Sequence, residues 1–425
     1  MASATTVTIR MYNPGFGDCF LITVKGDGRT WRMLVDCGVH SHGRFKVNGQ
    51  SRDIDEVVGA VIDQLVDESD DGTPALDVIV ATHRHADHIS GFANDAWKQV
   101  QVGEVWVPFV ENPDDADTQK LRGSLDETAK QLDELVAHAA KVRPRSTALA
   151  LAHEFAANSS GNAAAAKRLV TGAFANEGAV QIRYLPDTDP DKNDIPTPVN
   201  GVTVHVLGPS RDADQLKRMD PPKAVRWLQE ADAEALAGSD REELFDARYH
   251  IPKDQVDARV PADLIKVRNS MHLNDMAYDE DALLAASSLL ERSVNNTSVF
   301  FVLNVRGTRF VFVGDSQQGA WNHVLDDPKS RDLVTNAAFY KVGHHGSHNS
   351  TPKRFVEDVL GENATAMVPV GFVKRWASSI PHHKLMDALE AKHARIIRAD
   401  SPVPTDTVEV GADNLWTQAV FTVPD

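Results

Sequence analysis

The residues best suited to chemistry gather in one short segment, which reads HRHADH from position 83 to 88. Its metal-binding residue types are His83, His85, Asp87 and His88. The segment follows an apolar run at 76–81, which predicts a strand buried on both faces. Imidazole and carboxylate ligands suit zinc, and manganese or iron accepts the same donors. A solvated loop would explain a lone histidine, but four such residues at this spacing predict a metal site.

Further motifs lie far from this segment in the chain. They are GD at 17–18, LVDCG at 34–38, GD at 314–315 and KVGHHGS at 341–347. Together with the pattern HxHxDH, they resemble the metallo-β-lactamase-fold superfamily. The first GD and the HHGS motif resemble the branch typified by the hydrolase domain of competence DNA-uptake proteins. This resemblance implies an α/β fold, a four-layer αββα sandwich, with a two-metal site.

The resemblance also implies how the ligands divide between two divalent metal ions, Zn²⁺ or Mn²⁺. His83 and His85 would hold the first metal. Asp87 and His88 would hold the second, and Asp315 would bridge the two. A carboxylate-bridged pair of metals makes a bridging hydroxide from shared water, so Asp87 and Asp315 are also the expected catalytic residues, with Asp87 orienting the water or taking its proton.

Either His344 or His345 would complete the second metal's ligands. Glycine usually flanks the terminal ligand histidine, which favours His345, whereas His344 lies nearer the end of the strand. The superfamily carries a further histidine for the first metal, but this sequence reads VNNTS at 294–298. Asn295 and Asn296 would bind more weakly, so the first metal is expected to be the weaker one. His272 is a possible substitute.

Other residues are expected to support the ligands or to contact the substrate. They are Asp36, Asn296, Ser347, His382 and His383. Arg375 and Trp376, in the loop ahead of His382, are further candidate contacts. Ser350, Thr351 and Pro352 resemble the start of a helix over 353–360.

The elements that must position these residues follow from hydrophobic periodicity. Asp53 and Glu56 resemble a capping box for a helix over 54–66. Strands are expected at 6–12, 20–25, 31–36, 201–207, 298–305, 309–313 and 416–423. Helical spacing over about 111–180 and 211–290 predicts two helical insertions into a single domain spanning 1–425. Strands that alternate with helices in this way predict a layered α/β sandwich.

Charge and composition limit the partners. Lys plus Arg number 44 and Asp plus Glu 61, a net charge of −17, which works against long nucleic acid or an anionic membrane. Cys19 and Cys37 fall in apolar strands and are expected to be core thiols. No signal peptide or membrane span is evident, so a cytoplasmic location and no membrane contact are expected.

The function expected from these features is metal-dependent hydrolysis, most readily of phosphodiesters, as in a phosphodiesterase or nuclease. Small phosphoesters, or local contact with single-stranded nucleic acid, fit the acidic charge better than long DNA does. The alternatives are hydrolysis of a carbonyl ester, thioester, lactone or β-lactam, or a metal-binding subunit of a multi-protein system. In the last case the helical insertions would bind a protein partner.

Overall fold

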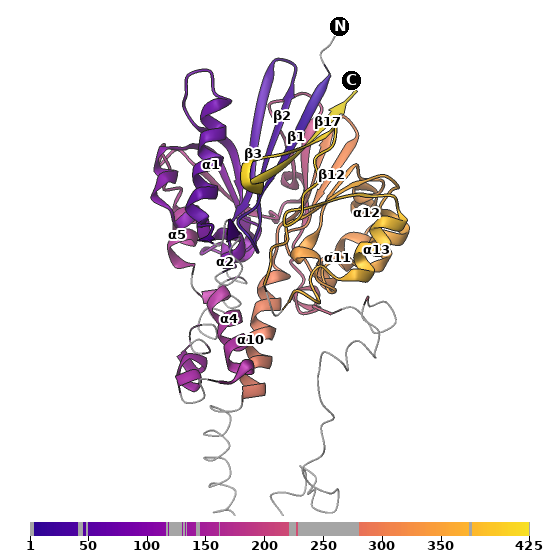
Figure 1. Ribbon diagram of the computed structural model, residues 1–425. Helices are drawn as coiled ribbons and strands as arrows, with labels where there is room; N and C mark the ends of the chain where they lie inside the picture. The colour runs from indigo at the N-terminus through magenta and orange to yellow at the C-terminus, as the bar shows by residue number, and fades with distance from the viewer. Residues whose placement is uncertain are drawn as a thin grey trace, which may run out of the picture.

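Two β-sheets pack face to face, and helices cover their outer faces (Figure 1). The computed structural model describes residues 4–40, 46–47, 50–115, 118, 130, 132, 134–141, 145–160, 162–220, 227, 280–373 and 376–424. Both sheets are mixed, with antiparallel and parallel strands. This arrangement agrees with the α/β sandwich predicted from the sequence.

The first sheet contains the strands that begin and end the described chain. Its strands, in spatial order, are β16 (Val408–Val410), β17 (Trp416–Val423), β1 (Thr5–Tyr12), β2 (Cys19–Gly26), β3 (Arg29–Cys37), β6 (Ala75–Val80), β7 (Gln101–Pro108) and β8 (Gln181–Leu185). β1 pairs antiparallel with β17, whereas β3, β6, β7 and β8 run parallel. The carboxyl ends of these parallel strands lie at the same end of the sheet, so the loop after β6 emerges at that end.

The second sheet supplies the other half of the site. In spatial order it contains β15 (Arg395–Arg398), β14 (Thr365–Val368), β13 (Phe339–Lys341), β12 (Thr308–Phe312), β11 (Phe300–Val305), β10 (Val202–Gly208) and β9 (Asp194–Pro196). β12 to β15 are parallel. A separate short hairpin pairs β4 (Lys46–Val47) with β5 (Gln50–Ser51). The predicted strands at 6–12, 20–25, 31–36, 201–207, 298–305, 309–313 and 416–423 are confirmed within about two residues.

Three apolar clusters hold these layers together. The central cluster joins the facing sides of the sheets and includes Val7 and Ile9 of β1 with Phe310 and Phe312 of β12. A second packs the first sheet against α1 (Ile54–Asp67) and α5 (Ala163–Thr171). A third packs the second sheet against α11 (Gln318–Asp326), α12 (Pro328–Val334) and α13 (His383–Ala391). Burial of these side chains is the main stabilising contribution.

The start of α1 follows its sequence pattern. Asp53 accepts a hydrogen bond from the backbone of the first turn, and Glu56 accepts one from the Asp53 backbone, which confirms the capping box. The helix predicted over 353–360 is confirmed over 353–359, where two α-helical residues lead into a π-helical segment, Phe355–Val359. No side-chain hydrogen bond caps the π-helical segment. The Ser350 hydroxyl donates to Gly343 O at 2.7 Å.

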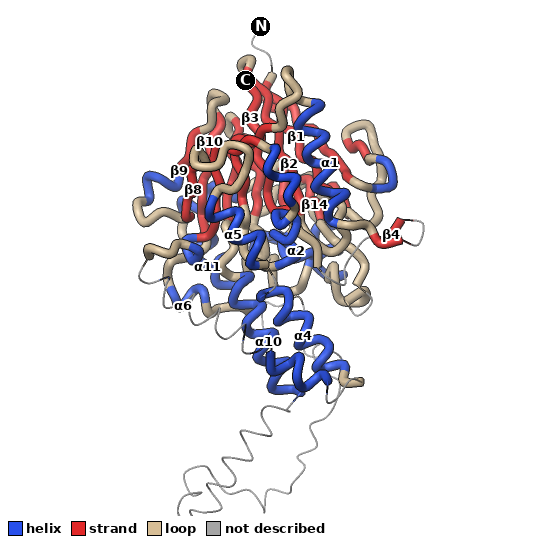
Figure 2. The backbone as a smooth tube through the Cα atoms, turned by 90° about the vertical axis from the view of Figure 1, so that its left-hand side faces the viewer, coloured by secondary structure: helices blue, strands red, loops and turns tan. Residues whose placement is uncertain are grey.

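Two long helices extend away from the sheets at the end opposite the chain termini (Figures 1 and 2). They are α4 (Thr147–Ser160) and α10 (Glu280–Asn295), which pack side by side. The shorter α6 (Ala213–Leu216) lies near α11. α4 and α10 come from the two segments predicted as helical insertions. The division into one domain with two insertions stays a prediction, since a part of the first segment and most of the second, including His272, lie outside the described residues.

Within the described part of the chain, no helix combines the length and the apolar character that a membrane crossing requires.

Candidate metal centre

The candidate ligands lie where loops from both sheets meet, at the end of the sheets opposite the termini. The loop after β6 leads into the short helix α2 (Ala86–Ile89), which carries Asp87 and His88. Asp315 follows β12, and His345 lies in a turn over Gly343–Gly346 after β13. Gly314 has a positive φ of 52°, and a Cβ there would lie 2.8 Å from the side chain of Ser298. Glycine is therefore required for the approach of Asp315 to the centre.

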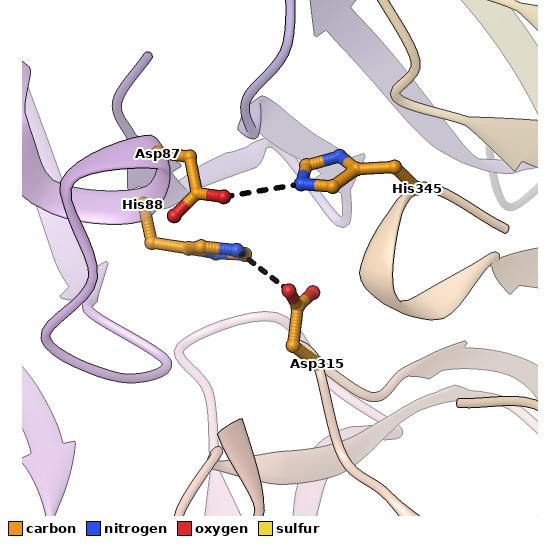
Figure 3. A group of neighbouring side chains, drawn as sticks. All are labelled: Asp87, His88, Asp315 and His345. Carbon is orange, nitrogen blue, oxygen red and sulfur yellow. Dashed lines mark hydrogen bonds and ion pairs between the residues drawn. The ribbon is translucent and has the colours of Figure 1, made fainter. Parts of the chain in front are cut away.

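Four side chains form the larger ligand group. Ligand atoms of Asp87, His88, Asp315 and His345 all lie within 4.8 Å of one another, and all four residues are buried. His88 Nε2 lies 3.2 Å from Asp315 Oδ2, and His345 Nε2 lies 3.3 Å from Asp87 Oδ2 (Figure 3). Two carboxylates and two imidazoles at this spacing have the donor types that bind a divalent transition metal.

The outer nitrogens of both imidazoles are anchored. His345 Nδ1 donates to Pro369 O at 2.7 Å, and His88 Nδ1 donates to Asp36 Oδ2 at 2.8 Å. Such bonds fix the ring orientation and leave the other nitrogen for a metal. His88 Nε2 is buried and faces the Asp315 carboxylate at 3.2 Å. The donors present therefore fit a metal ion, and Asp36 takes the supporting position expected for it.

Hydroxyl groups around His83 fix the position of its proton. His83 Nδ1 lies 3.2 Å from both Thr82 Oγ1 and Ser298 Oγ. Thr82 donates its hydroxyl hydrogen to Asp36 Oδ2, and Ser298 donates its own to Asn295 O, each at 2.7 Å. Because both hydroxyl hydrogens are used, His83 Nδ1 must be the donor. Nε2 then keeps a lone pair.

The same reasoning applies to His85 and defines a second group. His85 Nε2 lies 3.1 Å from Ser159 Oγ, whose hydrogen goes to Phe155 O, so Nδ1 of His85 keeps the lone pair. That lone pair faces His83 Nε2 at 3.0 Å. Two lone pairs so close repel each other unless a cation lies between them, and zinc–nitrogen bonds of about 2.0–2.1 Å would span the gap. With Asp87, these histidines form a group within 4.8 Å.

Burial and charge set the protonation states of these groups. Burial lowers the pKa of His83 and His85, which keeps both imidazoles neutral. Burial opposes ionisation of Asp87, but a hydrogen bond from His345 and the charge on His88 lower its pKa well below the usual range. Burial also opposes a charge on His88, but Asp315 and neighbouring aspartates raise its pKa. Neutral imidazole and ionised carboxylate are the forms that bind metal, so a metal ion held here would have to displace the His88 proton.

The sequence reasoning did not assign a role to Lys341 or to Asp18. Lys341 Nζ forms a close ion pair with Asp18, donates to Gly314 O at 2.9 Å and lies 3.5 Å from Asp315 Oδ1. Burial opposes the ammonium charge, but Asp18 and Asp315 raise the Lys341 pKa. The only sequence signal was the position of each residue within a motif, GD or KVGHHGS.

The two adjacent histidines of the HHGS motif, His344 and His345, differ in their position relative to the ligand groups. His345 belongs to the larger ligand group, whereas His344 belongs to neither group. His344 Nε2 lies 3.5 Å from Glu291 Oε1 of α10 and 4.0 Å from Asp315 Oδ2. Burial opposes its charge, but Asp315 and Glu291 raise the pKa of His344 to about 9. Glu291 had no signal in the sequence, because α10 reaches the site only through the tertiary fold.

Asn296 lies outside both ligand groups and serves the packing of helices. Its Nδ2 donates to the backbone oxygens of Gln215, Leu216 and Arg218 at 2.8–3.2 Å. Its Oδ1 accepts from the Gln317 backbone N–H at 3.2 Å. Both ends of the amide therefore hydrogen-bond to backbone groups, and the amide is not oriented toward the expected metals.

The remaining expected contacts lie at the margin of the centre. Ser347 Oγ donates to Asn349 Oδ1 at 3.0 Å. His382 precedes α13, where its ring stacks on His383 with the ring centres 4.8 Å apart. Neither of these two histidines belongs to a ligand group. Arg375 lies outside the described residues.

The fold and the centre together define a class: a mixed α/β protein with buried histidine–aspartate groups suited to divalent metal ions. No family model matches the sequence. The chain is 28% identical over 110 residues to ComE operon protein 3 of Bacillus subtilis (strain 168). That match covers 25% of this chain and only 13% of the relative. The similarity supports a distant, partial family link with that protein.

Proposed function

We propose that this protein is a metal-dependent hydrolase of the metallo-β-lactamase type that uses two divalent ions, Zn²⁺ or Mn²⁺, and acts on phosphodiesters. Among the described residues, three histidine–aspartate groups could hold a metal ion, and the third consists of Asp18, Asp36 and His88. The observation that carries the proposal is that the other two adjoin each other and share Asp87. One group has four ligands and the other has three. A purely structural zinc site closes with four ligands and needs no second group beside it.

The residues of the chain hold and orient this centre. Asp87 faces both groups, and Asn158 Nδ2 donates to its Oδ1 at 3.2 Å, which fixes the carboxylate. The His344 backbone N–H donates to Asp315 Oδ1 at 2.9 Å and orients the second carboxylate. When bound, two metal ions would activate water and stabilise negative charge on the oxygens of the reacting ester.

The motif resemblance favours phosphodiesters over carbonyl esters as substrates. The test uses purified protein loaded with Zn²⁺ or Mn²⁺ against bis(p-nitrophenyl) phosphate, single-stranded DNA and a lactone. We expect metal-dependent cleavage of a phosphodiester and none of the lactone. Cleavage of the lactone alone, or cleavage that persists after the metal is removed, would overturn the proposal.

A further inference from the structure

A cavity of about 600 Å³ adjoins the metal centre. Asp87 and His344 line it on the side of the centre, and the neighbouring helices α4 and α10 both contribute residues to its wall. This volume lies within the range of pockets that enclose one small molecule. The cavity is therefore the place from which a substrate reaches the two ligand groups.

Helix α4 contributes an apolar stripe to the wall. Leu151, Phe155 and Asn158 are spaced by four and three residues, so they lie on one face of the helix, and all three line the cavity. Asn158 also holds Asp87. The helix that fixes a ligand carboxylate thus also presents Leu151 and Phe155, both partly exposed, to the cavity.

Aromatic rings from two loops complete the wall. Trp376 is partly exposed, and its ring centre lies 4.9 Å from that of Phe16 and 5.2 Å from that of His40. Phe16 in turn lies against His345, with ring centres 4.0 Å apart. All these rings except His345 line the cavity. A planar aromatic group can therefore stack beside a reacting bond held at the centre.

The charges on the wall do not suit a long polyanion. Among the described lining residues, Asp87, Asp220 and Glu291 are acidic. The two cations are already paired with them: Arg292 lies 2.6 Å from Asp220, and the charged His344 lies 3.5 Å from Glu291. A groove for single-stranded nucleic acid needs a track of cations along the backbone. The wall instead offers apolar and aromatic surface next to the metal centre.

From these observations, and resting on the proposed function, we infer that the substrate is a small phosphoester carrying a planar aromatic group, and that Trp376 and Phe155 are the specificity-determining contacts for that group. The phosphoryl group faces Asp87, and the ring lies between the apolar face of α4 and Trp376. A long polynucleotide is not the substrate.

The test measures binding and does not depend on turnover. Phenylphosphonate and methylphosphonate carry the same charged group but differ in the ring, and each is titrated calorimetrically into Zn²⁺-loaded protein. We expect phenylphosphonate to bind at least about tenfold more tightly to the wild type. Trp376→Ala and Phe155→Ala should each lose most of this preference while their affinity for methylphosphonate stays the same.

Phe372→Ala is the matched control, because Phe372 lies in the same loop as Trp376, is 69% exposed and does not line the cavity. It should keep the full preference. Equal affinity of the wild type for the two phosphonates would overturn the inference. The inference would also be overturned if a 20-nucleotide oligothymidylate displaced phenylphosphonate and bound more tightly than phenylphosphonate does. A preserved ring preference without cleavage of any ester would contradict the proposed function alone.

Discussion

Lys341 places a positive charge among carboxylates that otherwise face one another in a buried site. Its ammonium group contacts Asp18 and lies 3.5 Å from Asp315 Oδ1, and all three side chains are at most 3% exposed. An unpaired charge in such a place is strongly destabilising. Lys341 therefore allows the carboxylates to stay ionised when metal is scarce.

Lys341→Met should destabilise the metal-free protein by about 3 kcal/mol, since breaking a buried pair leaves a carboxylate uncompensated. Saturating Zn²⁺ should recover part of this loss, because the cation supplies charge to the same carboxylates. Urea unfolding in chelator and in Zn²⁺ measures both values. The control is Lys329→Met, which should change stability little because that side chain is 82% exposed. If Lys341→Met lost the same stability with and without metal, the result would contradict the account.

Asp315→Asn should remove most of the metal from the larger group and abolish hydrolysis while the protein stays folded. The amide keeps the size of the side chain, but it is neutral and binds cations weakly. Elemental analysis and circular dichroism give the two readouts. Asp326→Asn serves as the control, because that side chain is 64% exposed and belongs to no ligand group. Wild-type activity in Asp315→Asn would argue against this centre.

The motifs located the candidate ligands in the sequence, and the structure brings the side chains of these motifs together. Their binding of metal stays a prediction. The choice between His344 and His345 did not follow from sequence, because both have positive φ in one turn and only the fold shows which ring faces Asp87. The surroundings of Asn296 did not follow from the sequence either. Its amide matches a ligand position in sequence, but its hydrogen bonds go to backbone groups of α6 and of the start of α11.

At the scale of elements, the residues that follow α10 contact α6, the start of α11 and Asp315, and α6 lies far from the other two in the sequence. Asn296 follows α10, and it bonds to the backbone around α6 and to the first turn of α11, where Ala320 N donates to its Oδ1 at 3.3 Å. Ser298, two residues further on, accepts a hydrogen bond from the Asp315 backbone N–H at 3.0 Å. The position of α10 is thereby coupled to a ligand of the metal centre.

Asn296→Ala should cost about 3 kcal/mol of stability, because several buried backbone groups lose their partners at once. Since the amide is not a ligand, the folded variant should still bind metal with an affinity close to wild type. Thermal unfolding and metal titration test the two parts. Asn322→Ala, on the partly exposed side of α11, is the control, and a variant that stays stable but loses metal would restore Asn296 as a ligand.

Local patterns predicted elements better than they predicted contacts between elements. The capping box and the apolar face of α1 lie within a few residues, so periodicity was sufficient. The role of α4 was not predictable, because Asn158 and Ser159 reach Asp87 and His85 across more than 70 positions in the chain. Helical spacing indicated that a helix exists there but carried no information on what it contacts.

At the scale of the whole molecule, the larger ligand group draws on both sheets. Asp87 and His88 follow a strand of the first sheet, whereas Asp315 and His345 follow strands of the second. A bound cation therefore links the two halves of the sandwich at one end. The central apolar cluster links them along the facing sides.

Removal of metal should lower the stability of the entire fold and not only that of a loop. A ligand that binds only the folded state at 100 times its dissociation constant contributes about 2.7 kcal/mol. We expect the thermal midpoint to fall in chelator and to rise again with added Zn²⁺ or Mn²⁺. Calorimetry that shows the same midpoint under all three conditions would contradict a cation held between the sheets.

The most direct test of the central claim is a calorimetric Zn²⁺ titration of the metal-free wild type and of the double variant Asp87→Ala, His88→Ala. The account predicts two binding events in the wild type, the tighter at the four-ligand group and the weaker at His83, His85 and Asp87. Both should weaken or disappear in a folded double variant, because Asp87 belongs to both groups. A double variant that binds Zn²⁺ as the wild type does, or a wild type that binds none, would contradict the account.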